Sequence, residues 1–123
     1  MEVKNKVYPS KDQMRGFFGT TNDNEPIYMV NLLKFKDKAE YKDGRKTNLT
    51  GREAYKIYAE FVKNHLQNIG GDLILHTDVT RMAVGEVEEL WDVVAIAKWP
   101  SRQIMGENMM PNDPKYLEAY QHR

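Results

Sequence analysis

The sequence contains no cysteine. Disulfide bonds, thiolate nucleophiles and cysteine-ligated metal sites are therefore excluded. Long apolar runs are also absent, because no stretch approaches the roughly 20 residues that a membrane-spanning helix needs. The first residues lack the apolar core of a signal peptide. These absences lead us to expect a soluble cytoplasmic protein that has no membrane partner.

The chain has no excess charge of either sign, since 18 basic residues balance 18 acidic ones. No net field would therefore attract nucleic acid or an anionic membrane, and we expect neither as a partner. The 123 residues suffice for one hydrophobic core, and a hydrophobic content of 41% is typical of a folded protein. We predict a single domain over residues 1–123, in which residues 1–25 form an N-terminal extension with a short helix.

Established catalytic motifs are absent as well. The sequence has no phosphate-binding glycine loop, no His-Glu-x-x-His zinc pair and no nucleophile elbow. His65, His76 and His122 are too scattered along the chain to predict a metal site. A single histidine can hold a haem, so haem binding is an alternative, but the sequence does not favour it. We expect no metal and no tightly bound cofactor.

Residues 27–35 are the most informative stretch that is present. They are nearly all apolar, with β-branched and aromatic side chains, and we predict that they form the central strand of a sheet. Both faces of this strand are apolar, so both need a cover. Asn31 lies in its middle. An unpaired buried carboxamide costs about 1–3 kcal/mol, so Asn31 should be hydrogen-bonded or face a wet cavity.

Four helices are predicted from their start signals and apolar spacing. These are a short helix from Ser10 to Gly19, a long helix over residues 51–69 that begins at a Thr50–Glu53 capping box, a helix capped by Ser101, and a last helix begun by Asp113-Pro114.

Two further strands follow the long helix. The first is predicted over residues 72–85, with His76 inside it and a bend or bulge near Asp78. The second covers residues 91–99, where two alanines leave space for a neighbouring surface or a ligand. The charged segment at residues 36–50 is either a solvated loop or a lid that brings Tyr41 and Arg45 over a pocket.

The order of elements after Pro26 is strand, helix, strand, strand, helix. This order is typical of an α+β, ferredoxin-like fold, in which helices cover one face of an antiparallel sheet. The other face would stay open in a monomer. Its apolar residues predict burial against a second copy, and hence a homodimer.

Several short motifs in the sequence resemble domain-of-unknown-function family number 1330, of the dimeric α/β-barrel superfamily. They are residues 26–36, Thr50-Gly-Arg-Glu-Ala-Tyr, Gly70-Gly71, Gly85, Trp91-Asp92, Trp99-Pro-Ser-Arg, and the closing segment from Tyr116 to His122-Arg123. The resemblance implies a ferredoxin-like homodimer whose two sheets face each other as a dimeric α/β barrel. Family members usually continue into a final strand beyond the His-Arg pair, so residues 2–8 are a candidate replacement for the fourth strand.

We place the predicted site in a cavity on the open sheet face. His76 could move a proton there, and Asn31 could polarise a carbonyl, so these are the candidate catalytic residues. The candidate ligand-binding residues are Tyr28, Tyr41, Arg52, Arg81 and Trp99. The alternative is that Asn31 and His76 are structural.

Two classes of function follow from this cavity. One is an enzyme without a tightly bound cofactor that acts on a small organic molecule by proton transfer or oxygenation. The other is a non-catalytic ligand-binding or structural dimer.

Overall fold

The computed structural model describes residues 2–19, 24–109 and 114–123. In chain order its elements are α1 (Lys11–Phe18), β1 (Ile27–Leu33), α2 (Gly51–Asn68), β2 (Asp72–Asp78), β3 (Val93–Trp99), α3 (Arg102–Met109) and α4 (Pro114–Gln121). The fold is α+β, with four helices and a three-stranded antiparallel sheet among the described residues. None of the helices in these ranges is long and apolar enough to cross a membrane.

The strand order is β1-β3-β2, so β3 is the central strand and β1 lies at an edge. The prediction that residues 27–35 form the central strand is therefore wrong. Residues 2–8, the candidate fourth strand, form no strand either, and the outer edge of β1 is unpaired among the described residues. The order of the three strands is nevertheless compatible with a ferredoxin-like fold.

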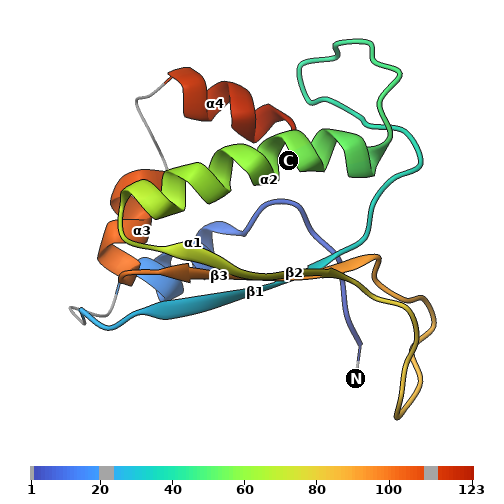
Figure 1. Cartoon of the computed structure of the whole chain (residues 1–123), viewed down its shortest axis with the longest axis horizontal. Coiled ribbons are helices and arrows are strands. Elements are labelled where there is room, and N and C mark those ends of the chain that lie inside the picture. Colours follow the sequence, from blue (N-terminus) through green and yellow to red (C-terminus); the bar gives the residue numbers. More distant parts are fainter. Residues whose placement is uncertain (1, 20–23, 110–113) are drawn as a thin grey trace.

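One face of the sheet is covered by helices, and the core lies there. Figure 1 shows α2 and α4 stacked above the sheet. The alternate residues of β3 point into this layer and are buried, from Val93 to Trp99. Trp99 packs with Leu66 of α2 and Met105 of α3. The helices of this one chain therefore supply the cover for one sheet face.

The opposite face of the sheet is open and apolar. In β1, Tyr28 is 56% exposed, Val30 62% and Leu32 47%. The register places these three residues beside Lys98, Ile96 and Val94 of β3. Leu75 and Thr77 of β2 complete the same face. We call these eight residues the open sheet face.

The helix boundaries agree with the sequence signals. Ser10 with Gln13, and Thr50 with Glu53, form complete capping boxes at the starts of α1 and α2. The side chain of Ser101 accepts a hydrogen bond from the Ile104 N–H at the start of α3. The predicted cap Asp113 lies outside the described residues.

The strand predicted over residues 72–85 is shorter than expected. β2 ends at Asp78, whose pairing partner is Val93, the first residue of β3. Beyond Asp78 one backbone hydrogen bond continues the pairing, from the Val79 N–H to the Asp92 carbonyl at 2.9 Å. The irregularity lies between Leu73 and Leu75, earlier than predicted, and it places His76 rather than Leu75 on the helix side.

Candidate functional site

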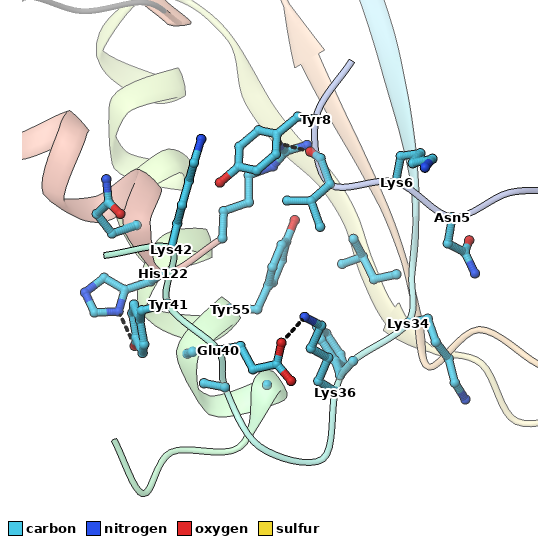
Figure 2. A pocket seen from close by; sticks show the side chains of 18 of the residues that line it. Asn5, Lys6, Tyr8, Lys34, Lys36, Glu40, Tyr41, Lys42, Tyr55 and His122 are labelled. Atoms are coloured by element: carbon cyan, nitrogen blue, oxygen red, sulfur yellow. Dashed lines mark hydrogen bonds and ion pairs between the residues drawn. The ribbon is translucent and has the colours of Figure 1, made fainter. Parts of the chain in front are cut away.

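A cavity of about 590 Å³ lies where the end of β1 meets both chain termini and the start of α2. We call it the β1-edge cavity; it is shown in Figure 2. Its apolar and aromatic lining consists of Val7, Tyr8, Leu32, Leu33, Phe35, Ala39, Tyr41, Gly51, Ala54 and Tyr55. Its polar lining consists of Asn5, Lys6, Lys34, Lys36, Glu40, Lys42, Gln121, His122 and Arg123.

The segment at residues 36–50 supplies one wall, and its two ends are tied together. The Gly51 N–H donates to the Lys36 carbonyl at 3.0 Å, and the Ala39 N–H donates to the Leu49 carbonyl at 2.9 Å. A side chain at Gly51 would place its Cβ only 2.5 Å from the Lys36 oxygen. The glycine therefore allows the close approach that folds this segment over the cavity.

The N-terminal segment forms the opposite wall, although it belongs to no strand. The Arg123 guanidinium donates to the Val7 carbonyl at 2.8 Å, and the Trp91 indole donates to the Asn5 carboxamide at 3.3 Å. The rings of Tyr8 and Tyr120 lie 6.0 Å apart. These contacts hold Val7 and Tyr8 against the end of the C-terminal helix, and Asn5 against the residues that precede β3.

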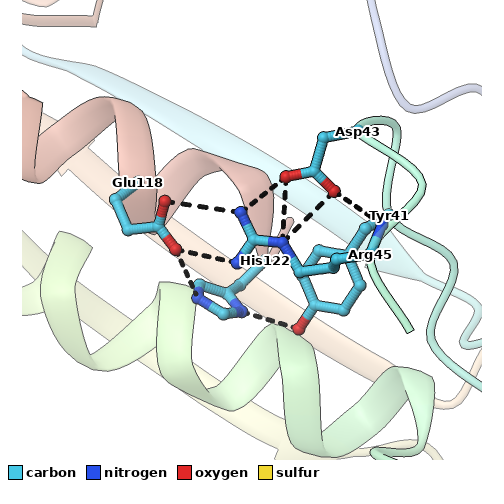
Figure 3. A network of polar contacts seen from close by, with 5 residues as sticks. All are labelled: Tyr41, Asp43, Arg45, Glu118 and His122. Carbon is cyan, nitrogen blue, oxygen red and sulfur yellow. Dashed lines mark hydrogen bonds and ion pairs between the residues drawn. The ribbon is translucent and has the colours of Figure 1, made fainter. Parts of the chain in front are cut away.

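Tyr41 and His122 form a hydrogen-bonded pair at the cavity. Their Tyr41 Oη and His122 Nδ1 atoms are 2.7 Å apart, Tyr41 is only 9% exposed, and Figure 3 shows the network behind them. His122 Nε2 faces a Glu118 carboxylate oxygen at 3.7 Å. A carboxylate at this distance favours the ring proton on Nε2, so Nδ1 is free to accept from the Tyr41 hydroxyl.

Arg45 organises the outer end of this network. It bonds Glu118 at 2.8 Å and Asp43 at 2.7 Å, and its guanidinium lies 4.8 Å from the centre of the Tyr41 ring. Hydrogen bonds from Arg45 hold the pKa of both carboxyl groups, Asp43 and Glu118, below their ordinary values. Both carboxylates are therefore charged at neutral pH and keep Arg45 over Tyr41.

Tyr55 of α2 lies in the middle of the cavity lining (Figure 2). Burial, with a smaller contribution from Tyr58, raises the pKa of Tyr55 to about 12. Its phenol therefore stays protonated at neutral pH. It can donate a hydrogen bond to a bound molecule.

Of the residues predicted from the sequence, Tyr41 lines the β1-edge cavity, and the Arg45 guanidinium stacks over the Tyr41 ring. Five residues of the segment at residues 36–50 line the cavity, whereas Arg45 does not, and the lid interpretation stays a prediction. The other predicted residues lie elsewhere.

Asn31 and His76 share a row of the sheet, because both pair with Ala95. Ala95 is buried on the helix side, so Asn31 and His76 belong to that side too. The expectation that they line the open sheet face is wrong. The Asn31 amide donates to the Met29 carbonyl at 3.2 Å, which satisfies part of the carboxamide locally. Their predicted role in binding or catalysis stays a prediction.

Trp99 closes no cavity on the open face, because it is 5% exposed within the helix-side core. Tyr28 does lie on the open sheet face, with the Lys98 ammonium 5.9 Å from its ring centre. Arg52 pairs with Asp78 at 2.8 Å and lines a second, shallower hollow of about 750 Å³ beside Lys34 and Asp92. Arg81 is exposed on the segment between β2 and β3.

Most of the cavity lining was missed as site candidates, including Tyr8, Lys42, Tyr55, His122 and Arg123. Tyr55 flanks the apolar stripe of α2, and this position in the sequence pattern could have indicated a side chain at the border of the core. Tyr8 and His122 lie near opposite ends of the chain, and only the fold brings them to one cavity. Within residues 2–19, 24–109 and 114–123, no group of three or more His, Asp or Glu side chains is placed to hold a metal ion.

Comparison with protein-family models and with curated proteins finds no match. The resemblance to family number 1330 therefore stays a prediction. Among solved structures, the chain is similar to the RPA0582 protein of unknown function from Rhodopseudomonas palustris, with 30% identity and a TM-score of 0.78 over 97% of this chain and 86% of that one. The methylated form of RPA0582 gives 35% identity and a TM-score of 0.78 over 98% and 85% of the two chains.

Proposed function

Since the chain belongs to the family of the RPA0582 protein, we propose that it is a ferredoxin-like homodimer that binds a small molecule in the β1-edge cavity of each protomer. That relative is described as a protein of unknown function. The proposal therefore rests on the geometry of this chain.

The single observation that carries the binding function is the cavity itself. Its volume of about 590 Å³ lies within the range of roughly 300–1,000 Å³ that small-molecule sites occupy. Its lining combines apolar and aromatic side chains with polar groups, among them the Tyr41–His122 pair and the protonated Tyr55. Apolar side chains bury the body of a ligand, while the polar groups fix its orientation.

The dimer is proposed from the open sheet face. Its neighbouring exposed apolar residues, such as Val30, Leu32 and Leu75, form a patch of the kind that soluble monomers seldom leave in water. A second copy related by a two-fold axis would present the same patch and cover it. Two sheets that face each other in this way would make the dimeric α/β barrel that the sequence predicts.

The binding proposal is tested with a panel of small organic fragments and amide correlation spectra. Fragments that bind should shift the resonances of residues 5–8, 36–42 and 121–123. Ala39→Trp would fill the cavity and abolish these shifts, whereas Ala83→Trp, on an exposed residue between β2 and β3, would preserve them. The proposal fails if no fragment shifts the cavity resonances, or if both variants behave alike.

The Tyr41–His122 pair favours a second candidate function, proton-transfer catalysis. A phenol hydrogen-bonded to an imidazole, itself backed by a carboxylate, can exchange a proton with a bound molecule. The matching reaction is enolisation: a C–H bond beside a carbonyl breaks, its electron pair forms a C=C bond, and the carbonyl oxygen takes up a proton. This reaction needs no oxidant and no reductant.

Enolisation can be followed with phenylpyruvate in deuterium oxide, where the benzylic protons exchange for deuterium. We expect the protein to accelerate this exchange and His122→Gln to remove the acceleration while phenylpyruvate still binds. Unchanged exchange with bound phenylpyruvate would leave a ligand-binding dimer without this activity.

A further inference from the structure

The lining of the β1-edge cavity is rich in positive charge. Five cationic side chains and one carboxylate contribute to it: Lys6, Lys34, Lys36, Lys42 and Arg123 against Glu40. The whole chain is neutral, so this excess is local. A neutral protein that gathers cations around one cavity favours an anion there over a neutral molecule.

Two of the five cations already have acidic partners. Lys36 forms an ion pair with Glu40 at 2.6 Å, and Lys34 reaches Glu89 at 3.2 Å and Asp92 at 3.5 Å. In Figure 2 the Lys34 side chain points away from Tyr55 and out of the cavity. These two lysines therefore do not account for an anion site.

Lys42 and Arg123 have only neutral partners within the part of the chain that the structure describes. The Lys42 ammonium lies 5.2 Å from the centre of the Tyr8 ring. The Arg123 guanidinium donates to the Val7 carbonyl and, at 3.0 Å, to the Tyr120 hydroxyl. Lys42 thus contacts Tyr8, and Arg123 contacts the neighbouring Val7. Both cations therefore lie at the wall that the N-terminal segment forms.

Tyr55 supplies a neutral donor at the same end. Its side chain rises from α2 toward the segment that carries Tyr8 (Figure 2). Arg123 lines the same cavity as Tyr55. A hydroxyl and two cations therefore lie at one end of the cavity, whose lining also includes the apolar side chains of Val7, Leu33 and Ala54.

We infer that the β1-edge cavity takes a small organic anion, whose carboxylate or similar group is held by Lys42 and Arg123 with the Tyr55 hydroxyl as a further donor. The apolar body of this ligand lies against Val7, Leu33 and Ala54. This inference rests on the proposed binding function and adds the chemical class of the ligand. Bonds from cations to an anion are stronger than bonds between neutral groups, so the charge decides the preference.

The test compares benzoate with benzamide, two probes with the same ring that differ in charge. We expect benzoate to shift the amide resonances of residues 6–8, 42 and 123 and to bind about tenfold more tightly than benzamide. Lys42→Met, which keeps the apolar stem, should reduce this ratio. Lys63→Met, on the exposed face of α2, should leave it unchanged.

Equal affinities of the two probes at the cavity would overturn the anion preference and leave the proposed binding function intact. Equal losses in Lys42→Met and Lys63→Met would also overturn it, because long-range attraction would then explain the preference. If neither probe reaches the cavity, the inference fails, and the fragment panel decides separately whether the cavity binds small molecules.

Discussion

At the scale of residues, the account depends on the contact between Tyr41 and His122. Tyr41 comes from the segment before α2, and His122 follows α4, so this one hydrogen bond joins parts of the chain 81 residues apart. Both side chains are largely buried, with His122 15% exposed. A partner lost at such a site leaves a poorly solvated polar atom behind.

We therefore predict that Tyr41→Phe lowers the free energy of unfolding by about 1 kcal/mol. The measurement is equilibrium unfolding in urea of Tyr41→Phe, His122→Phe and the double variant. The double-mutant cycle should give a coupling energy of about 1 kcal/mol. A coupling energy near zero would mean that the two side chains do not stabilise each other.

The buried tyrosines predict a loss of stability at alkaline pH. Burial raises the pKa of Tyr55 from 10 to about 12, and burial also raises the pKa of Tyr58 and Tyr116. A group whose pKa is higher in the folded state contributes stability that is present below its unfolded pKa. This contribution is lost as the pH rises through the folded pKa, so the free energy of unfolding should fall between pH 10 and 12.

Urea unfolding at a series of pH values measures this fall, and the ultraviolet absorbance of tyrosinate shows which phenols resist ionisation. Tyr55→Phe should make the decline shallower than in the unaltered protein. A free energy of unfolding that is independent of pH in this window would contradict the burial of these phenols.

At the scale of elements, the helices were predictable and the strand order was not. Ser10 and Thr50 mark their helix starts through contacts only three residues away. Such local signals are visible in any sequence. Residues 27–35 seemed central because both faces are apolar, yet strand order depends on pairing between residues that are distant in sequence. His122 at the cavity was unpredictable for the same reason.

The segment at residues 36–50 yields a prediction at this scale. Gly51→Ala would force its Cβ against the Lys36 carbonyl and separate the two ends of the segment. We expect a loss of about 1–3 kcal/mol in the free energy of unfolding and weaker fragment binding at the cavity. Urea unfolding and the fragment spectra measure the two effects.

Gly16→Ala in α1 is the matched control, because a Cβ at Gly16 meets nothing within 4 Å. Alanine in a helix is more favourable than glycine by about 0.5–1 kcal/mol, so this variant should be slightly more stable. If Gly51→Ala proves as stable as Gly16→Ala, the close contact with Lys36 does not hold the segment.

At the scale of the whole molecule, the open sheet face is the feature that a monomer leaves unexplained. We predict that Val30→Asp, halfway along β1 on this face, weakens the dimer by at least about 100-fold, because a two-fold interface would bury two carboxylates. Sedimentation equilibrium measures the association, and circular dichroism checks that the fold persists.

Val84→Asp is the control, since Val84 is 87% exposed outside the sheet. This variant should associate like the unaltered protein. Equal association of Val30→Asp and the unaltered protein would place any interface elsewhere on the molecule.

We propose a homodimer with one ligand cavity in each protomer. The most direct measurement is a native mass spectrum of the protein with the tightest-binding fragment, beside that of Ala39→Trp. We predict a dimer that takes up two fragment molecules, and an Ala39→Trp dimer that takes up none. A monomer, or equal uptake by both proteins, would contradict the account.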